Sequence, residues 1–307
     1  MTAVLPAPTF SPRTTPEAAQ ACGTTWKKGR QGRDQGPSKS SCSSDGVEEE
    51  VKFEVRFQLL YLKVHGLAAT ARAILAISGL PWESIYPSDW ANVEKAQTPF
   101  GTMPVLYETH TTTTTRPAAA ASAATTTRST TLQIPESEVI EQYLGRKFGL
   151  VGQDPWEEVA ILSFYASTKN VMQTYVSKVL MSNHTSGGGS GAAEAKALEL
   201  RWFVERDLPA WITLHERWLA ENGTNGHYVG DQVGLRLSLA DVRTAVSVER
   251  YMMIPEAQDL FSADLTPGLW AVKQKLDSHE RYAAWKASEE YAAIDAWSKH
   301  RQTVLSK

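Results

Sequence analysis

Cysteine is scarce in this chain of 307 residues, which contains only Cys22 and Cys42. Both lie near the N-terminus, and no cysteine follows them. A disulfide framework, a zinc cluster built on thiolates and a cysteine nucleophile are therefore excluded from the sequence after Cys42. We expect a protein with no metal site and no bound cofactor.

Long apolar runs and a large excess of charge of one sign are absent as well. No run approaches the roughly 20 apolar residues that span a bilayer, and the net charge at pH 7 is only -3. The hydrophobic fraction of 42% still supplies ample material for a packed core. We expect a cytoplasmic protein with no membrane partner and no nucleic-acid partner.

Three segments lack hydrophobic periodicity. Residues 1–50 are rich in Pro, Ser, Thr and Gly, and they hold too little apolar surface to offset the entropy of ordering. We expect a disordered tail there. Residues 109–131 are almost wholly Thr and Ala, and this low-complexity insertion is expected to loop out into solvent. The sequence HTSGGGSG at 184–191 is expected to be a flexible connector.

The remaining sequence divides into a mixed half and a helical half. From Phe53 to Leu150 the patterns predict a β-α-β unit and then a β-β-α unit. The strands are expected at 56–62, 82–87, from Pro104 onward and at 132–134, and the helices at 66–77 and 136–148. After Asp154 the patterns predict only helices, at 155–182, 193–221, 239–253, 267–277 and 280–299. The fold class is therefore α/β plus all-α.

Several motifs occur together in a recognisable order. They are LLYLKVHGLAATARAIL from Leu59, DW at 89–90, PFGTMPVL at 99–106, PESEVIEQYLGRKFGLVG from Pro135 and NGHYVGDQVGLRLSLADV from Asn225. Together they resemble the cytosolic glutathione S-transferase family, of the sigma-like tyrosine type. The resemblance implies a thioredoxin-like glutathione-binding domain at 53–150 and a helical-bundle domain at 154–307. It also implies a homodimer, with glutathione as co-substrate.

Tyr61 is the catalytic residue that this resemblance implies. Such an enzyme stabilises the thiolate of glutathione, whose thiol pKa is about 8.5 if it behaves as free cysteine. A hydroxyl donor beside the sulfur makes a charge-assisted hydrogen bond of ~1.5 to 3 kcal/mol, which equals roughly one to two pKa units. No Ser or Cys lies between Tyr61 and Leu67. The alternative is that Tyr61 is a buried aromatic residue of a strand.

Six residues match positions that bind glutathione in the family: Trp90, Lys95, Met103, Pro104, Glu136 and Ser137. A cis bond before Pro104 leaves the backbone of Met103 free to pair with the peptide. The start of a helix at Ser137 favours the γ-glutamyl carboxylate. The plainer alternatives are a trans-proline at a strand start, a simple helix cap and a core tryptophan.

Two positions depart from the family pattern. Leu67 stands where sigma-like relatives often have an arginine that supports the thiolate, and Thr102 stands where Gln or Lys is usual. Leucine cannot donate a hydrogen bond. His65 is a candidate substitute, and its alternative role is structural.

Two functions stay open. The first is an enzyme that conjugates glutathione to small apolar electrophiles, with Tyr165 and Met172 facing the electrophile, although both also suit core positions. The second is a non-catalytic glutathione-transferase-like module for interaction or scaffolding. Retention of Tyr61, the Met103–Pro104 pair and the Glu136–Ser137 pair favours the enzyme.

The segment from Ser238 to Asp241 has the form of a capping box, in which each side chain pairs with the other residue's backbone N–H. The resemblance places it at the start of a central buried helix. We expect Asp241→Ala to cost ~1 to 2 kcal/mol of stability.

Overall fold

A computed structural model describes residues 50–116, 124–180, 191–229 and 237–305. The predicted tail at 1–50, apart from Glu50, and the connector at 184–191, apart from Gly191, lie outside the described residues. Within the described residues, no helix is both long and apolar enough to cross a bilayer.

Four strands form one mixed sheet in the order β2-β1-β3-β4. Strand β1 pairs in parallel with β2 and antiparallel with β3, and β3 pairs antiparallel with β4. A 3-10 turn and helix α1 join β1 to β2, and helix α3 follows β4, so the predicted β-α-β and β-β-α units are confirmed. The bounds are β1 Glu50–Leu60, the 3-10 turn Gly66–Ala68, α1 Ala69–Ser78, β2 Trp82–Ile85, β3 Val105–Arg116, β4 Ala124–Pro135 and α3 Ser137–Lys147.

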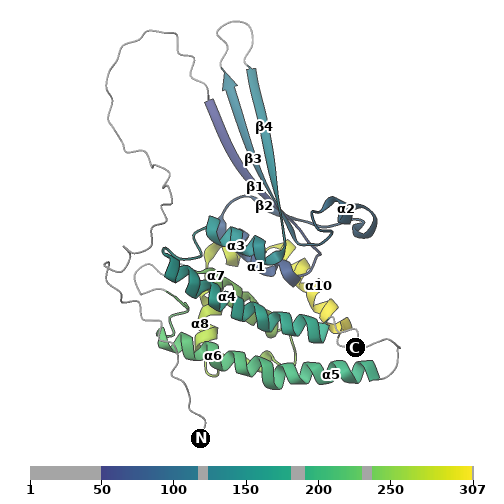
Figure 1. The fold of residues 1–307 in the computed structure, drawn as a ribbon, viewed down its shortest axis with the longest axis vertical. Helices are drawn as coiled ribbons and strands as arrows, with labels where there is room; N and C mark the ends of the chain where they lie inside the picture. The colour runs from purple at the N-terminus through teal and green to yellow at the C-terminus, as the bar shows by residue number, and fades with distance from the viewer. Residues whose placement is uncertain (1–49, 117–123, 181–190, 230–236, 306–307) are drawn as a thin grey trace, which may run out of the picture. The chain divides into compact units, whose positions relative to one another are not determined.

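The prediction that residues 109–131 loop out into solvent is wrong for the described part of that segment. Strands β3 and β4 run on through the Thr-rich sequence, with Thr109 opposite Thr131 and Arg116 opposite Ala124. The β-branched side chain of threonine favours extended backbone, and the first residues of β1 pair with the same stretch of β3. The insertion therefore lengthens a hairpin, which extends beyond the helices in Figure 1.

All regular secondary structure in the described part of the chain after Asp154 is helical. The bounds of the helices are α4 Pro155–Tyr175, α5 Gly191–Trp202, α6 Leu208–Glu221, α7 Leu239–Tyr251, α8 Pro267–Asp277, α9 Glu280–Lys286 and α10 Glu289–Leu305. The single helix predicted at 280–299 is two helices, because Ser288 accepts a hydrogen bond from the backbone N–H of Tyr291 and so caps the start of α10.

Helix α7 lies at the centre of the helical half and is buried along most of its length. It contacts α1, α3, α4 and α8, and Figure 1 shows α1 and α3 between the sheet and the longer helices. The predicted capping box is confirmed: Asp241 N–H donates to Ser238 Oγ at 3.1 Å, and Ser238 N–H donates to Asp241 Oδ2 at 2.8 Å.

A buried ion pair joins the two halves of the chain. Arg243 on α7 donates to both carboxylate oxygens of Glu141 on α3 at 2.8 Å, and it also reaches the hydroxyl of Thr70 on α1 at 3.2 Å. Tyr165 on α4 donates its hydroxyl proton to Glu141 at 2.9 Å. Four helices from both halves therefore share one polar cluster. Within it the charges of Arg243 and Glu141 compensate each other.

Candidate functional site

Tyr61 directly follows β1 and is buried against the turn that starts α1. The backbone N–H of Leu67 donates to the Tyr61 hydroxyl oxygen at 3.0 Å. Because the oxygen is the acceptor in this bond, the hydroxyl proton stays available for donation to another group. The structure thus holds the phenol in place without using its proton.

Gly66 is what allows Tyr61 to lie so close to this turn. Its φ is +42°, and a Cβ atom built there would lie 2.4 Å from the Tyr61 hydroxyl oxygen. A non-glycine residue would therefore meet both an unfavourable backbone conformation and a clash with the phenol.

Met103 and Pro104 lie at the entry to β3. The bond between them is cis, as expected from the sequence. Pro104 is buried and Met103 is half-buried. The register pairs the next residue, Val105, with Pro135 at the end of β4, so the start of β3 lies beside the start of α3.

Glu136 joins β4 to α3 in an unusual conformation. Its φ is +69°, and its side chain makes no capping hydrogen bond to the helix. Ser137 is the first residue of α3, where the leading N–H groups of a helix have no partner inside it. The hydroxyl of Thr102 donates to the Glu136 carboxylate at 3.4 Å, and so the structure brings Thr102, Met103 and Glu136 together.

Lys95 and Trp90 lie in the segment between β2 and β3. Lys95 opens the short helix α2 (Lys95–Gln97), and Trp90 opens the π-helical turn before it (Trp90–Glu94). The exposed Lys95 side chain passes Gly101, since a Cβ built at Gly101 would lie 3.5 Å from Lys95 Cε. Lys95 is therefore near the Met103 segment. Trp90 is half-buried.

The two residues predicted to face the electrophile lie in the interior. Tyr165 is 1% exposed and gives its hydroxyl proton to Glu141. Met172 is 7% exposed and belongs to the same hydrophobic core. Their burial favours packing roles, and their contact with an electrophile stays a prediction.

His65 is buried under the C-terminal helix. Its backbone N–H donates to Ser298 Oγ on α10 at 2.8 Å. Its ring lies against the ring of Tyr291, and its Nε2 atom is 3.6 Å from Asp295 Oδ1. Burial, followed by the charge of Arg250, lowers the pKa of His65 to about 4. The ring is therefore neutral near pH 7 and offers no positive charge to a thiolate.

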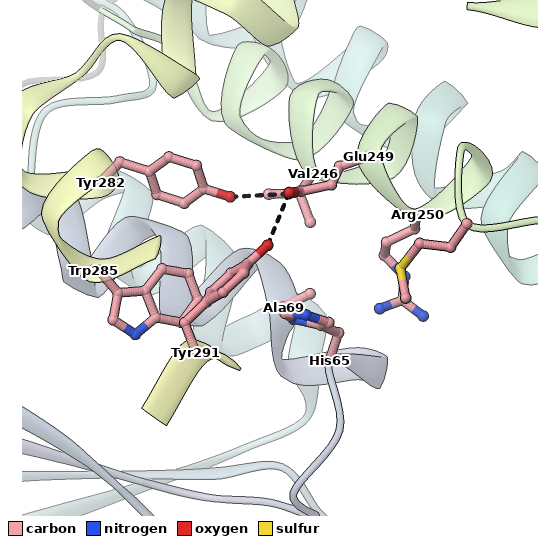
Figure 2. A pocket seen from close by; sticks show the side chains of 9 residues that line it. His65, Ala69, Val246, Glu249, Arg250, Tyr282, Trp285 and Tyr291 are labelled. Atoms are coloured by element: carbon pink, nitrogen blue, oxygen red, sulfur yellow. Dashed lines mark hydrogen bonds between the residues drawn. The ribbon is translucent and has the colours of Figure 1, made fainter. Parts of the chain in front are cut away.

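Arg250 lies near this site, and none of the motifs quoted above includes it. It lines a cavity with His65, Ala69 and two other residues of α7, Val246 and Glu249; Figure 2 shows them around the cavity. The sequence does contain a sign that Arg250 lies inside the protein. Arg243 and Arg250 are seven residues apart in an otherwise mostly apolar helical pattern, and so they lie on one face of α7.

The comparisons with known proteins agree on one family. Residues 189–289 match the family model of the glutathione S-transferase C-terminal domain. Glutathione S-transferase 1 of Ascaris suum is 31% identical over 119 residues, which cover 38% of this chain and 47% of that protein. S-crystallin 4 of Enteroctopus dofleini is 22% identical over 235 residues, or 75% of this chain and 94% of that protein.

Solved structures show the same fold. The Pi-class glutathione S-transferase of Onchocerca volvulus superposes with a TM-score of 0.56 at 19% identity, over 79% of this chain and 98% of that one. The chain spans about half the length of the curated glutathione S-transferases that it matches, 47% and 42% for two nematode proteins.

A mixed four-stranded sheet with a cis-proline before β3, followed by a helical half, has the architecture of a thioredoxin-like domain joined to a helical-bundle domain. The family model over residues 189–289, the curated relatives and the solved structures support the cytosolic glutathione S-transferase family that the motifs predict. The sigma-like subclass and the domain boundaries at 53–150 and 154–307 stay predictions.

Proposed function

We propose that this protein conjugates glutathione to small hydrophobic electrophiles. The observation that carries the proposal is the hydroxyl of Tyr61, which the N–H of Leu67 holds at 3.0 Å while its proton stays unused. The same chain retains the Met103–Pro104 and Glu136–Ser137 pairs close to each other in space. A scaffold has no physical need for all three features.

In this proposal Tyr61 stabilises the thiolate of glutathione. The S–H bond of glutathione breaks, the proton leaves to solvent, and the sulfur keeps the electron pair with which it attacks the electrophile. A hydrogen bond from the phenol to the sulfur contributes ~1.5 to 3 kcal/mol, which lowers the thiol pKa by roughly one to two units from about 8.5. Much of the bound glutathione is then ionised near pH 7.

The peptide is held, in this proposal, along the edge formed by the starts of β3 and α3. The backbone of Met103 pairs with the cysteinyl unit, and Ser137 with the first N–H groups of α3 receives the γ-glutamyl carboxylate. Glu136 faces the peptide's amino group, while Lys95 and Trp90 approach the glycyl end. Tyr165 and Met172 support the electrophile side from α4. No further cofactor and no metal takes part.

The family also suggests a cytoplasmic homodimer with a detoxification role, and we propose the same for this chain. Light scattering of the purified protein tests the dimer: a mass near twice that of the 33.8 kDa chain supports it, and the mass of one chain contradicts it.

Turnover with a generic aromatic electrophile tests the function, comparing the wild type with Tyr61→Phe. We expect turnover to fall at least tenfold in Tyr61→Phe while retention on immobilised glutathione persists, because only the hydroxyl is lost. Tyr107→Phe is the matched control, since Tyr107 is a half-buried tyrosine on the neighbouring strand β3. Equal turnover in Tyr61→Phe and the wild type contradicts the catalytic role.

The second candidate is a non-catalytic module that binds partners. It is favoured by Leu67 and Thr102 at two positions of the site and by the similarity to S-crystallin 4 over most of the chain. Retention of the wild type on immobilised glutathione without any turnover supports this candidate and contradicts the enzyme.

A further inference from the structure

The proposed site lacks a positive charge where the chain has Leu67. The side chain of Leu67 is 38% exposed and apolar, and the neighbouring His65 is neutral near pH 7 because its pKa is lowered to about 4. A phenol alone can hold a thiolate, but a nearby cation lowers the pKa of an acid by a further one to three units or so. Another cation near Tyr61 could supply this effect.

Arg250 approaches this turn from α7. It lines one cavity with His65 and Ala69, and these two residues flank Leu67 in the chain. Figure 2 shows its side chain extending from α7 toward the side of the cavity that holds His65. The helical half of the protein thus places a guanidinium beside the turn on which Tyr61 rests.

The guanidinium of Arg250 has no acidic partner among the described residues. Its Nη1 atom is buried and has no hydrogen-bond partner, and no carboxylate of the described residues forms an ion pair with it, whereas Arg243 is paired with Glu141. Arg72, the other buried arginine on this side, lies 5.8 Å from the centre of the Tyr61 ring. Each of its three nitrogens already donates to a neutral acceptor, namely the carbonyls of Leu62 and Val64 and the hydroxyl of Ser84.

The carboxylate of Glu249, the residue next to Arg250, is bonded to residues other than Arg250. Its carboxylate accepts hydrogen bonds from the hydroxyls of Tyr282 and Tyr291 and from the ammonium of Lys286, at 2.6 to 3.2 Å. Asp295 on α10 faces His65 and pairs with Lys299. The negative charges packed around the cavity therefore already have their own partners.

The guanidinium of Arg250 interacts electrostatically with the phenol of Tyr61. Burial lowers the pKa of Arg250, and Tyr61 leads the groups that oppose this, ahead of Tyr175 and Tyr251; the charge of Arg243 adds to the lowering. A negative charge that develops beside the Tyr61 hydroxyl would lie within the field of the same guanidinium.

We propose that Arg250 supplies the positive charge that stabilises the glutathione thiolate, in place of a cation at position 67. The inference rests on the proposed conjugation reaction and adds to it a role for a residue of the helical half. The S–H bond still breaks with loss of its proton to solvent, and Arg250 stays protonated throughout. Its charge lowers the thiol pKa, and Tyr61 supplies the hydrogen bond.

The absence of an acid beside Arg250 is explained by this role. A buried cation without a partner destabilises the folded state, and a carboxylate in its place would cancel the charge that the thiolate needs. Replacing Arg250 by methionine, which has a similar length and no charge, is therefore expected to leave the melting temperature unchanged or to raise it.

Titration of the bound thiol tests the proposal. The thiolate of glutathione bound at saturation is followed by its ultraviolet difference absorbance against pH, in the wild type, Arg250→Met, Arg250→Lys and the double variant Arg250→Met with Leu67→Arg. The pH profile of kcat/KM with an aromatic electrophile is recorded alongside. Arg206→Met is the control, since Arg206 is exposed and pairs with Asp207 away from the cavity.

We expect the thiol pKa to rise by about one unit or more in Arg250→Met, with the pH profile of kcat/KM moving by the same amount. We expect Arg250→Lys to keep part of the effect, Leu67→Arg to restore the low pKa in the double variant, and Arg206→Met to match the wild type. A purely structural role would change affinity or stability without moving the thiol pKa.

A missing role of Arg250 and a missing conjugation activity give different results. If wild type and Arg250→Met bind glutathione with the same thiol pKa, the role of Arg250 is overturned while conjugation through Tyr61 stands. If the lysine variant shows the full rise of the methionine variant, charge is not the cause and the role is again overturned. A wild type with neither glutathione binding nor turnover overturns both.

Discussion

At the scale of single residues, the site depends on how closely Tyr61 packs against the turn before α1. The hydroxyl accepts a hydrogen bond from Leu67 N–H, and Gly66 lies directly beside the ring. The motif around Tyr61 could be recognised in the sequence, because its residues are close together in the chain. The role of Gly66 as the residue that makes room for the phenol needed coordinates.

Gly66→Ala should reduce conjugation at least tenfold, because the new Cβ atom would lie 2.4 Å from the Tyr61 hydroxyl oxygen and push the phenol away from the sulfur. Strain at a positive φ is expected to cost ~1 to 3 kcal/mol of stability in addition. Turnover and thermal melting measure the two effects.

Gly149→Ala is the matched control for this substitution. Gly149 has a φ of +71° but nothing within 4 Å of a built Cβ atom. The Gly149→Ala variant should therefore lose about as much stability as Gly66→Ala and keep the turnover of the wild type. Full turnover in Gly66→Ala would show that the packing of Tyr61 does not matter for the reaction.

At the scale of helices and strands, local sequence predicted most of what the structure shows. The N-cap of α7 at Ser238 is where the pattern places it. The low complexity of the Thr-rich insertion indicates a loop, whereas its β-branched residues form strand once β1 pairs alongside them. The break before α10 depends on one capping serine that periodicity does not detect.

Asp241→Ala should cost more than the ~1 to 2 kcal/mol expected of a helix cap. The buried carboxylate also pairs with the His227 ring at 3.1 Å and with the N–H of Tyr228 at 3.0 Å. Each donor left without a partner in the interior costs ~1 to 3 kcal/mol. We expect a loss of about 3 kcal/mol in denaturant unfolding.

Ser238→Ala isolates the cap from the rest of this network, since it removes only the oxygen that accepts from Asp241 N–H. Its cost should stay near 1 kcal/mol. Equal losses for Ser238→Ala and Asp241→Ala would mean that the bonds to His227 and Tyr228 contribute nothing.

At the scale of the whole molecule, the two halves meet through side chains that the sequence separates widely. Arg243 joins Glu141 and Thr70 across the junction, while Arg250, two turns further along α7, faces the Tyr61 turn. Motifs of neighbouring residues could be matched to a family from the sequence. The distinct surroundings of the two arginines could not be predicted, because they depend on contacts between distant segments.

Arg243→Met should cost ~3 to 5 kcal/mol, because it leaves the buried carboxylate of Glu141 without its cation. Arg250→Met, on the same helix and with the same change of side chain, should cost nothing measurable. Chemical denaturation of the two variants side by side checks the contrast, and equal losses would contradict the assignment of one arginine to structure and the other to the site.

The central claim is that the protein ionises the thiol of bound glutathione. The most direct test is the pKa of that thiol in the wild-type complex, measured by titrating the thiolate absorbance. Tyr61 and Arg250 together predict a value at least one unit below the free thiol value of about 8.5. A bound thiol that titrates like free glutathione would contradict the account.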